Sequence, residues 1–343
     1  MPSSSFITQM PKVELHVHLE GAVRPETLLK LAQKNRISLP ANTVDGLQNW
    51  YSFVNFPHFV DIYVKISECI QKPDDLELVT REFMEGQAAQ NILYTEATYT
   101  AYTHLHQKGL SFADQLAAIN RARAWGESAL GVQMNLIVDI AREVSPEEGL
   151  LTADMVIESY GNGVVALGLG GYEVGHPPEK HAASFAKVQA AGVPCVLHAG
   201  ETAGPESIWG ALRAGYSQRI GHGVRCLEDE ALVAHLREKQ IPLEVCPTSN
   251  VCLGVVPSLA DHPIQKLLDA GLYVTVNSDD PPMFNTTLTQ EFETCTKTFG
   301  WDVQLLERLT MNAARAALLP NDQNAALQGR ITDGFASLRA QMA

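Results

Sequence analysis

The chain has 343 residues, of which 45% are hydrophobic, 7% aromatic and 19% charged. At about 150 residues per domain this length suggests two domains, although α/β barrels of this size often fold as one. With 25 Lys and Arg against 39 Asp and Glu, the formal net charge is -14. This balance argues against a nucleic-acid binder, whose affinity depends on clustered basic residues, but it does not exclude a small nucleoside ligand.

The N-terminus and the cysteines favour a cytoplasmic protein. The first ten residues lack a basic segment followed by an apolar run, so no signal peptide is predicted. No stretch approaches the ~18 apolar residues of a membrane span, which predicts no membrane association. Six cysteines without a C-x-x-C pair are typical of reduced thiols. We expect residues 1–10 to form a flexible arm and residues 11–343 a single domain, of unknown oligomeric state.

Short apolar runs alternate with longer amphipathic segments along the chain. The runs are rich in Val, Ile and Leu and lack a polar face, as expected of parallel strands buried on both sides. The predicted strands are Val13–His18, Ile92–Thr98, Gln133–Ile140, Val164–Leu169, Pro194–His198, Arg219–Gly223, Leu243–Pro247 and Tyr273–Ser278. The predicted helices are Pro25–Asn35, Phe112–Leu130, Ser145–Tyr160, Glu179–Ala191, Pro205–Ala214, Glu228–Lys239, His262–Ala270 and Val303–Leu318.

Eight strand-then-helix units predict a (β/α)₈ TIM barrel, with an open doubly wound sheet as the alternative. The segment 55–90 inserts extra helices after the first strand, and these could cover the mouth of the barrel. An aromatic cluster in and just before this segment would either line a specificity pocket or attach the extra helices to the barrel. Its members are Trp50, Tyr51, Phe53, Phe56, Phe59 and Tyr63.

Groups able to do chemistry follow most of the predicted strands. Barrel enzymes build their active sites at the carboxyl ends of several strands, so we expect these groups to meet at one mouth. They are His16 and His18 after the first strand, Gly170 and Gly171 after the fourth, His198 and Glu201 after the fifth, His222 after the sixth, and Asp279 and Asp280 after the eighth.

His16 and His18 are two residues apart on a strand, so their side chains point to the same side. Alone, such a pair is as often a satisfied core pair as a pair of metal ligands. His198 and Asp279 strengthen the metal interpretation, because the barrel would bring them to the same mouth. Three imidazoles and one carboxylate suit Zn²⁺, with Fe²⁺ or Co²⁺ as alternatives, and a position left for water makes the site catalytic.

Three further residues have two interpretations each. Glu201 follows a predicted ligand by three residues and is either a general acid/base or a carboxylate stabilised by a helix N-terminus. His222, flanked by glycines, either orients a metal-bound water or is structural. Asp280 either faces the substrate or belongs to an Asp-rich turn that caps a helix.

Five motifs resemble the adenosine/adenine deaminase branch of the amidohydrolase superfamily. They are KVELHVHLEGA (12–22), HAGE (198–201), RIGHG (219–223), EVCPTSN (244–250) and NSDDP (277–281), and they occur in the family's order. The resemblance runs from about Pro11 to Pro320 and implies a barrel that holds one zinc ion per chain. It also implies an enzyme that hydrolyses the 6-amino group of an adenine ring.

The resemblance also implies roles for individual residues. The zinc ligands would be His16, His18, His198 and Asp279. Glu201 would donate a proton to purine N1, His222 would help deprotonate and orient the water, and Asp280 would bond the N7 side. The backbone N–H of Gly171 would contact N3, and His18 and Glu20 would complete the substrate-binding set.

The choice of substrate is the least specific part of the resemblance. Glu20 stands where related adenosine deaminases tend to have an aspartate that contacts the ribose 5′-hydroxyl, and SDDPPMF (278–284) resembles bacterial members. We expect a purine nucleoside substrate, with adenosine or 2′-deoxyadenosine converted to the inosine form and ammonia. The alternatives are a 5′-modified adenosine such as aminodeoxyfutalosine, free adenine, or a catalytically silent nucleoside-binding relative.

Overall fold

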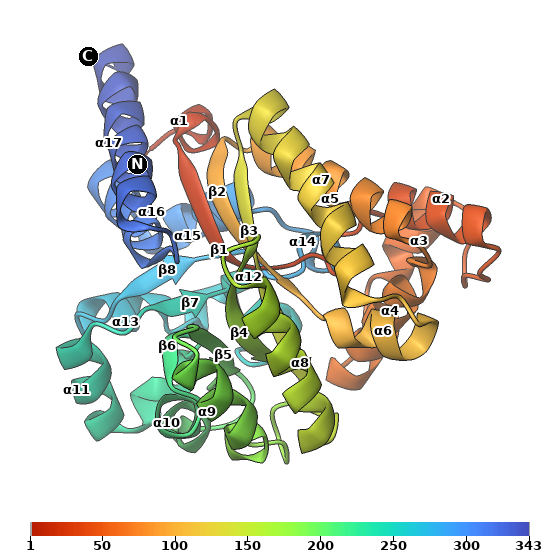
Figure 1. The fold of residues 1–343 in the computed structure, drawn as a ribbon. Coiled ribbons are helices and arrows are strands. Elements are labelled where there is room, and N and C mark those ends of the chain that lie inside the picture. Colours follow the sequence, from red (N-terminus) through yellow and green to blue (C-terminus); the bar gives the residue numbers. More distant parts are fainter. Residues whose placement is uncertain (1, 343) are drawn as a thin grey trace.

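Eight parallel strands form one sheet in the order β1 to β8 (Figure 1). This computed structural model describes residues 2–342. The strands are β1 (Lys12–His18), β2 (Ile92–Tyr99), β3 (Gln133–Ala141), β4 (Val164–Gly170), β5 (Cys195–Ala199), β6 (Ser217–His222), β7 (Leu243–Val245) and β8 (Val274–Val276). All eight predicted strands are confirmed, and each observed end lies within two residues of the predicted one. The (β/α)₈ barrel is therefore the fold.

The barrel closes between β8 and β1 through the residues that carry the predicted metal ligands. The backbone N–H of Asp279 donates to the carbonyl of His16 at 3.1 Å, and the N–H of His18 donates to the carbonyl of Asp279 at 2.9 Å. Below this point the side chain of Asn277 replaces the backbone ladder, because its Oδ1 accepts from the N–H groups of Leu15 and His16 at 2.9 and 3.1 Å.

The helices surround this sheet. Before β4 they are α1 (Ser4–Gln9), α2 (Pro25–Asn35), α3 (Val44–Trp50), α4 (Phe56–Cys69), α5 (Pro73–Ala89), α6 (Ala101–Lys108), α7 (Phe112–Leu130) and α8 (Pro146–Ser159). After β4 they are η1 (Pro178–His181), α9 (Ala182–Ala190), α10 (Pro205–Arg213), η2 (Val224–Glu228), α11 (Glu230–Lys239), α12 (Pro247–Cys252), η3 (Leu259–Asp261), α13 (Ile264–Asp269), α14 (Pro281–Phe284), α15 (Leu288–Phe299), α16 (Val303–Ala316) and α17 (Asn321–Met342).

The predicted segment 55–90 does form helices, α4 and α5, but only α4 is additional to the barrel. Helix α5 packs against β2 and α7, so it takes the place of the first barrel helix. The additional helices are α2, α3 and α4, which gather at one side of the molecule in Figure 1. Helices α1, α3, α6, α12, α14, α15 and α17 were not predicted from the sequence.

The structure differs from the flexible arm expected for residues 1–10. Ser3 caps helix α1 by accepting a hydrogen bond from the N–H of Phe6. Phe6 and Ile7 are buried, and the ring of Phe6 lies 6.1 Å from that of Phe335 in α17. The prediction failed because the surface that covers these two apolar side chains comes from the other end of the chain.

The inward faces of β3 to β5 change from apolar to polar toward their carboxyl ends. Ile137, Ala166 and Val196 pack together in one small apolar cluster. Two residues further along their strands, Asp139 and His198 point to the same side and line a cavity. An apolar layer in the barrel interior therefore lies directly beneath the polar side chains that line the cavity.

Within residues 2–342 we find no helix with the length and apolar character needed to cross a membrane.

Candidate active site

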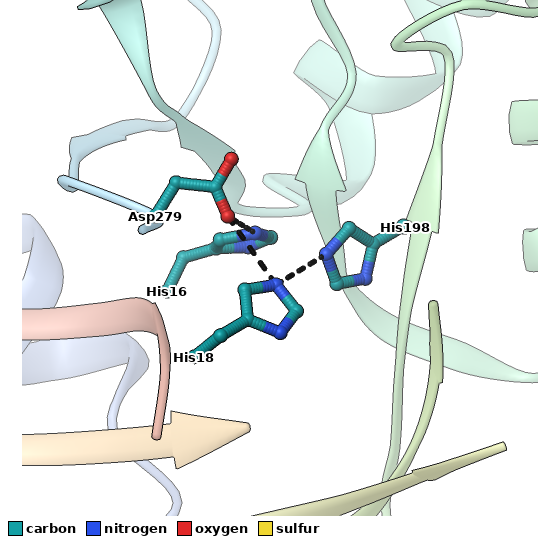
Figure 2. A group of neighbouring side chains, drawn as sticks. All are labelled: His16, His18, His198 and Asp279. Atoms are coloured by element: carbon teal, nitrogen blue, oxygen red, sulfur yellow. Dashed lines mark hydrogen bonds and ion pairs between the residues drawn. The ribbon is translucent and has the colours of Figure 1, made fainter. Parts of the chain in front are cut away.

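Four side chains from β1, β5 and the end of β8 point toward one another at the carboxyl mouth of the barrel (Figure 2). His18 Nε2 lies 3.1 Å from His198 Nε2 and 3.3 Å from Asp279 Oδ1. His16 Nε2 lies 3.4 Å from the same carboxylate oxygen. All four potential ligand atoms lie within 4.8 Å of one another. The four residues predicted as ligands thus form one group.

Hydrogen bonds to the outer nitrogens orient two of these imidazoles. His16 Nδ1 lies 3.0 Å from Glu244 Oε2, and Arg219 Nε donates to the other oxygen of Glu244 at 2.5 Å. His198 Nδ1 lies 2.8 Å from the carbonyl of Leu169 and donates to it. Because Nδ1 is engaged in both rings, Nε2 faces the centre of the group, as is usual for metal-binding histidines.

A hydroxyl orients the carboxylate of Asp279. Ser249 Oγ donates to Asp279 Oδ2 at 2.6 Å, which leaves Oδ1 to face the imidazoles. Asp279 itself has a left-handed backbone, with φ of 65°. A positive φ is uncommon for a residue other than glycine and often occurs at functional sites.

The charges around the group suit a dication. Burial alone would lower the pKa of His16 and His18, but Asp279 and Glu244 raise that of His16 to about 10, and Asp280 and Asp279 raise that of His18 to about 9. Nε2 of His16 is buried and makes no hydrogen bond within the described part of the chain. A metal ion would replace the protons that these carboxylates favour, so the donor set fits a divalent cation.

A second group of potential ligands overlaps the first. It consists of His16, His222, Cys246 and Asp279, so it shares two members with the four-residue group. Burial and the nearby charge of Asp279 raise the pKa of the Cys246 thiol well above its usual value. A thiol must lose its proton to bind a metal, so this second group is the weaker candidate.

Glu201 lies beside the four-residue group without belonging to it. Its Oε1 is 3.6 Å from His222 Nε2 and makes no hydrogen bond within residues 2–342. Burial, together with the charges of Asp279 and Glu173, raises its pKa well above the usual value. Burial therefore favours the protonated form of Glu201, the form required of a general acid.

The loop that carries Glu201 is held by another buried carboxylate. Glu173 accepts hydrogen bonds from the four successive backbone N–H groups of residues 200–203, at 2.5, 3.1, 2.8 and 2.8 Å. Such a carboxylate fixes the direction in which the loop leaves β5. Sequence reasoning assigned no role to Glu173.

His222 ends β6 and is oriented by a chain of side chains. The N–H of Ile264 donates to Nδ1 of His262, so the remaining proton of neutral His262 is on Nε2, which lies 3.0 Å from Asn250 Oδ1. Asn250 Nδ2 then donates to Nδ1 of His222 at 3.3 Å. The proton of neutral His222 is therefore on Nε2, which faces Glu201.

Gly221, the residue before His222, leaves space for the imidazole ring of His16. A Cβ on Gly221 would lie 2.8 Å from Cε1 of His16, closer than side-chain atoms approach. Burial lowers the pKa of His222 to about 3, with the charge of His16 acting in the same direction. His222 is thus a neutral group at physiological pH.

Asp280 and Gly171 lie where the sequence predicts, at the ends of β8 and β4. Oδ1 of Asp280 makes no hydrogen bond within the described residues, and a Cβ on Gly21 would collide with it at 1.5 Å. Burial and the charge of Asp279 raise the pKa of Asp280 well above its usual value. Gly171 has φ of 93°, and Glu143 Oε2 lies 2.6 Å from where its Cβ would be.

One cavity joins these groups. The additional helix α4 contributes one wall through Phe56, Phe59, Val60, Tyr63 and Val64. The floor and the opposite wall include His18, Asp139, Gly171, His198, Glu201, His222, Asp279 and Asp280. Of the six residues of the aromatic cluster, Phe56, Phe59 and Tyr63 line the cavity. Tyr51 is instead buried, and its hydroxyl donates to the carbonyl of Val23.

Glu20 lies behind this cavity rather than in its lining. Its Oε1 accepts from the N–H of Thr100 at 3.1 Å and lies 3.2 Å from Nε2 of His104. The hydroxyl of Tyr63 donates to its Oε2 at 3.2 Å. Both oxygens of Glu20 are therefore engaged within the protein, and Tyr63 stands between them and the cavity.

Sequence reasoning missed several residues of the site. Glu244 and Asp139 are carboxylates inside otherwise apolar strands, and that interruption was the available signal. Ser249 and Asn250 lie within the EVCPTSN motif, which was recognised without assigning roles to its members. His262 had no signal, because its partner Asn250 reaches it only in the folded chain.

A barrel with three imidazoles and one carboxylate at its carboxyl mouth is the architecture of the amidohydrolase superfamily, and comparisons with known proteins agree. The adenosine deaminase family model matches residues 11–334. The chain belongs to this family, whose members are hydrolytic deaminases. It is 38% identical to an adenine deaminase of Stutzerimonas stutzeri (strain A1501), covering 91% of this chain and 98% of the relative. It is 37% identical to an aminodeoxyfutalosine deaminase of Streptomyces coelicolor, covering 92% and 82%.

Solved structures give the same result. The adenine deaminase of Arthrobacter aurescens superposes with a TM-score of 0.90 at 33% identity, covering 94% of this chain and 98% of that one. An amidohydrolase of Burkhoderia ambifaria with bound Zn superposes with a TM-score of 0.92 at 26% identity, covering 99% and 95%. The resemblance stated from the motifs is thereby confirmed.

Proposed function

We propose that this protein is a zinc-dependent enzyme that hydrolyses the exocyclic amine at C6 of an adenine ring and releases ammonia. The observation that carries the proposal is the buried, unpartnered carboxyl oxygen of Glu201, 3.6 Å from Nε2 of His222, in the same cavity as the four potential ligands. A bound zinc ion supplies a water of lowered pKa.

The remaining chemistry belongs to the side chains. Glu201 donates its proton to N1, which makes C6 more electrophilic and allows the water oxygen to add there. As the C6–O bond becomes a carbonyl, one proton of the water goes to the amino group, whose bond to C6 breaks to release ammonia, and the other proton returns to Glu201. Asp280, whose pKa burial also raises, donates a hydrogen bond to N7. His222 presents the N–H of Nε2 to the attacking oxygen and holds it over C6. Gly171 offers its backbone N–H to N3.

We propose that one zinc ion binds per chain. The second potential ligand group shares His16 and Asp279 with the first, so both groups cannot be filled independently. Elemental analysis of zinc-loaded protein should give about one ion per chain. Two bound ions per chain would refute this proposal. Removal of the metal with a chelator should abolish turnover, and added zinc should restore it.

The substrate class has two candidates. The family motifs favour an adenosine-type nucleoside, such as adenosine or a 5′-modified adenosine. One structural observation favours the free base: Glu20 stands where related adenosine deaminases tend to have an aspartate that contacts the ribose, and its carboxylate is fully engaged behind Tyr63. The relatives named adenine deaminase support the same choice.

Deamination by the zinc-loaded protein, followed by ultraviolet absorbance, tests both points. The substrates are adenine, adenosine, 2′-deoxyadenosine and a 5′-substituted adenosine. Preference for adenine supports the free-base candidate, and preference for a nucleoside supports the prediction from the motifs. No turnover of any of them would contradict the proposed function and leave the catalytically silent relative.

A further inference from the structure

One buried carboxylate of the cavity has no role in the proposed chemistry. Asp139 lies on β3, lines the cavity and is only 3% exposed. Its Oδ1 is buried and makes no hydrogen bond within residues 2–342. Burial of a carboxylate oxygen without a donor is costly, so such a group in a binding cavity points to a ligand that supplies the donor.

Two glycines of the neighbouring strand leave space for this carboxylate. Asp139 pairs with Gly168 in the register of β3 and β4. A Cβ on Gly168 would lie 2.8 Å from Cβ of Asp139, and a Cβ on Gly170 would lie 2.5 Å from its Oδ2. Any side chain at either position would displace Asp139. Burial raises the pKa of Asp139 to about 6.

The order of strands around the barrel indicates which part of a purine meets Asp139. In the proposed orientation, N1 faces Glu201 after β5, N3 faces Gly171 after β4, and N7 faces Asp280 after β8. On the perimeter of a purine, N9 lies between N3 and N7 on the side away from N1. It must therefore face the arc from β3 round to β1. Of the two buried carboxylates in that arc, Asp139 has an oxygen without a hydrogen-bond donor, whereas both oxygens of Glu20 accept hydrogen bonds from the protein.

We propose that Asp139 accepts a hydrogen bond from the N9–H of free adenine and is the residue that selects the free base over N9-substituted purines. This inference rests on the proposed function and names its substrate. In this orientation the N9–H form of adenine directs its ring proton toward the arc that contains Asp139. A nucleoside has no proton on N9, and its glycosidic carbon would face an unpaired buried carboxylate.

Adenine and 9-methyladenine provide the test, since they differ at N9 by one methyl group. We expect the zinc-loaded wild type to favour adenine by at least tenfold in kcat/KM. Asp139→Asn keeps the shape but removes the charge, and it should lose most of this preference through a lower kcat/KM for adenine. Asp333→Asn is the matched control, because it makes the same change at an exposed position of α17, outside the cavity, and should leave the ratio as in the wild type.

A binding measurement separates the inference from turnover. Hypoxanthine and 9-methylhypoxanthine, the corresponding products, are titrated into zinc-loaded protein in a calorimeter. The wild type should bind hypoxanthine at least tenfold more tightly, and Asp139→Asn should reduce the difference to within about threefold. Asp139→Ala serves as a second variant, and circular dichroism and zinc content check that each variant is folded.

The outcomes distinguish the two proposals. If the wild type deaminates 9-methyladenine or adenosine as well as adenine, Asp139 does not select the free base, although the deaminase proposal stands. The same holds if Asp139→Asn keeps the wild-type ratio in both turnover and binding. If no adenine compound is deaminated, the proposed function fails, and the binding ratio of the products still tests Asp139 by itself.

Discussion

Nδ1 of His16 lies 3.0 Å from Oε2 of Glu244, and this contact determines which nitrogen of His16 faces the other potential ligands. Glu244 is in turn paired with Arg219, which also pairs with Glu96 on β2 at 2.5 Å. All three charged side chains are at most 2% exposed. The orientation of His16, a potential ligand on β1, thus depends on a buried chain of charges that crosses the barrel.

Glu244→Gln should weaken zinc binding. The neutral amide would form a weaker hydrogen bond with His16 and would leave Arg219 without one of its two carboxylate partners. Loss of a residue that orients a metal-binding histidine typically costs 10- to 100-fold in metal affinity. Competition with a chromogenic chelator measures the zinc dissociation constant. Glu228→Gln, which breaks the exposed ion pair with Arg225, is the control. Equal dissociation constants for the two variants would show that Glu244 does not support the site.

Glu201→Gln should keep zinc and lose turnover. Glu201 is not in the ligand group, so zinc content should remain that of the wild type. The amide cannot donate a proton to N1 as an acid does, so kcat should fall by about 10² to 10⁴-fold. Steady-state rates and elemental analysis of the same preparation measure both quantities. Near-normal turnover would remove Glu201 from the mechanism.

Asn277→Ala should destabilise the barrel at its closure. The substitution removes the acceptor for the backbone N–H groups of Leu15 and His16, both buried between β8 and β1. Each unsatisfied group costs about 1–3 kcal/mol, so the thermal midpoint should drop by several degrees. Scanning calorimetry measures the drop against Asn42→Ala, a change at an exposed position. A midpoint equal to that of the control would mean that water replaces the amide without cost.

His262 should make the stability of the protein depend on pH. Burial lowers the pKa of His262 in the folded state to about 4, below its value of about 6.5 in an unfolded chain. The unfolded state therefore takes up the proton first, and stability falls as the pH drops from 6.5 toward 4. His262→Gln keeps a donor for Asn250 but cannot titrate.

The wild type should therefore lose stability relative to His262→Gln on acidification, by an amount on the order of 2 kcal/mol between pH 7 and 4.5. Thermal midpoints of the two proteins across this range give the comparison. Other histidines titrate in both proteins and cancel in the difference. Parallel curves would mean that His262 has an ordinary pKa in the folded protein.

The sequence by itself determined the barrel and the positions of the predicted ligands. Eight apolar runs of strand length, separated by helical segments, allow few other topologies. His16 and His18 follow from the two-residue period of a strand, and His198 and Asp279 from their places at strand ends. These inferences succeeded because they depend on local periodicity and on chain order alone.

Only the tertiary structure decided which polar groups are engaged and which are open. Glu20 and Asp139 are both buried carboxylates close to the cavity, and no local pattern distinguishes them. The oxygens of Glu20 are taken up by Tyr63, Thr100 and His104, all more than forty residues away in the sequence. Asp139 keeps an open oxygen because two glycines of the next strand make room without offering a donor. A hydrogen bond forms between whichever groups the fold brings together, so its partners are fixed by packing rather than by local sequence.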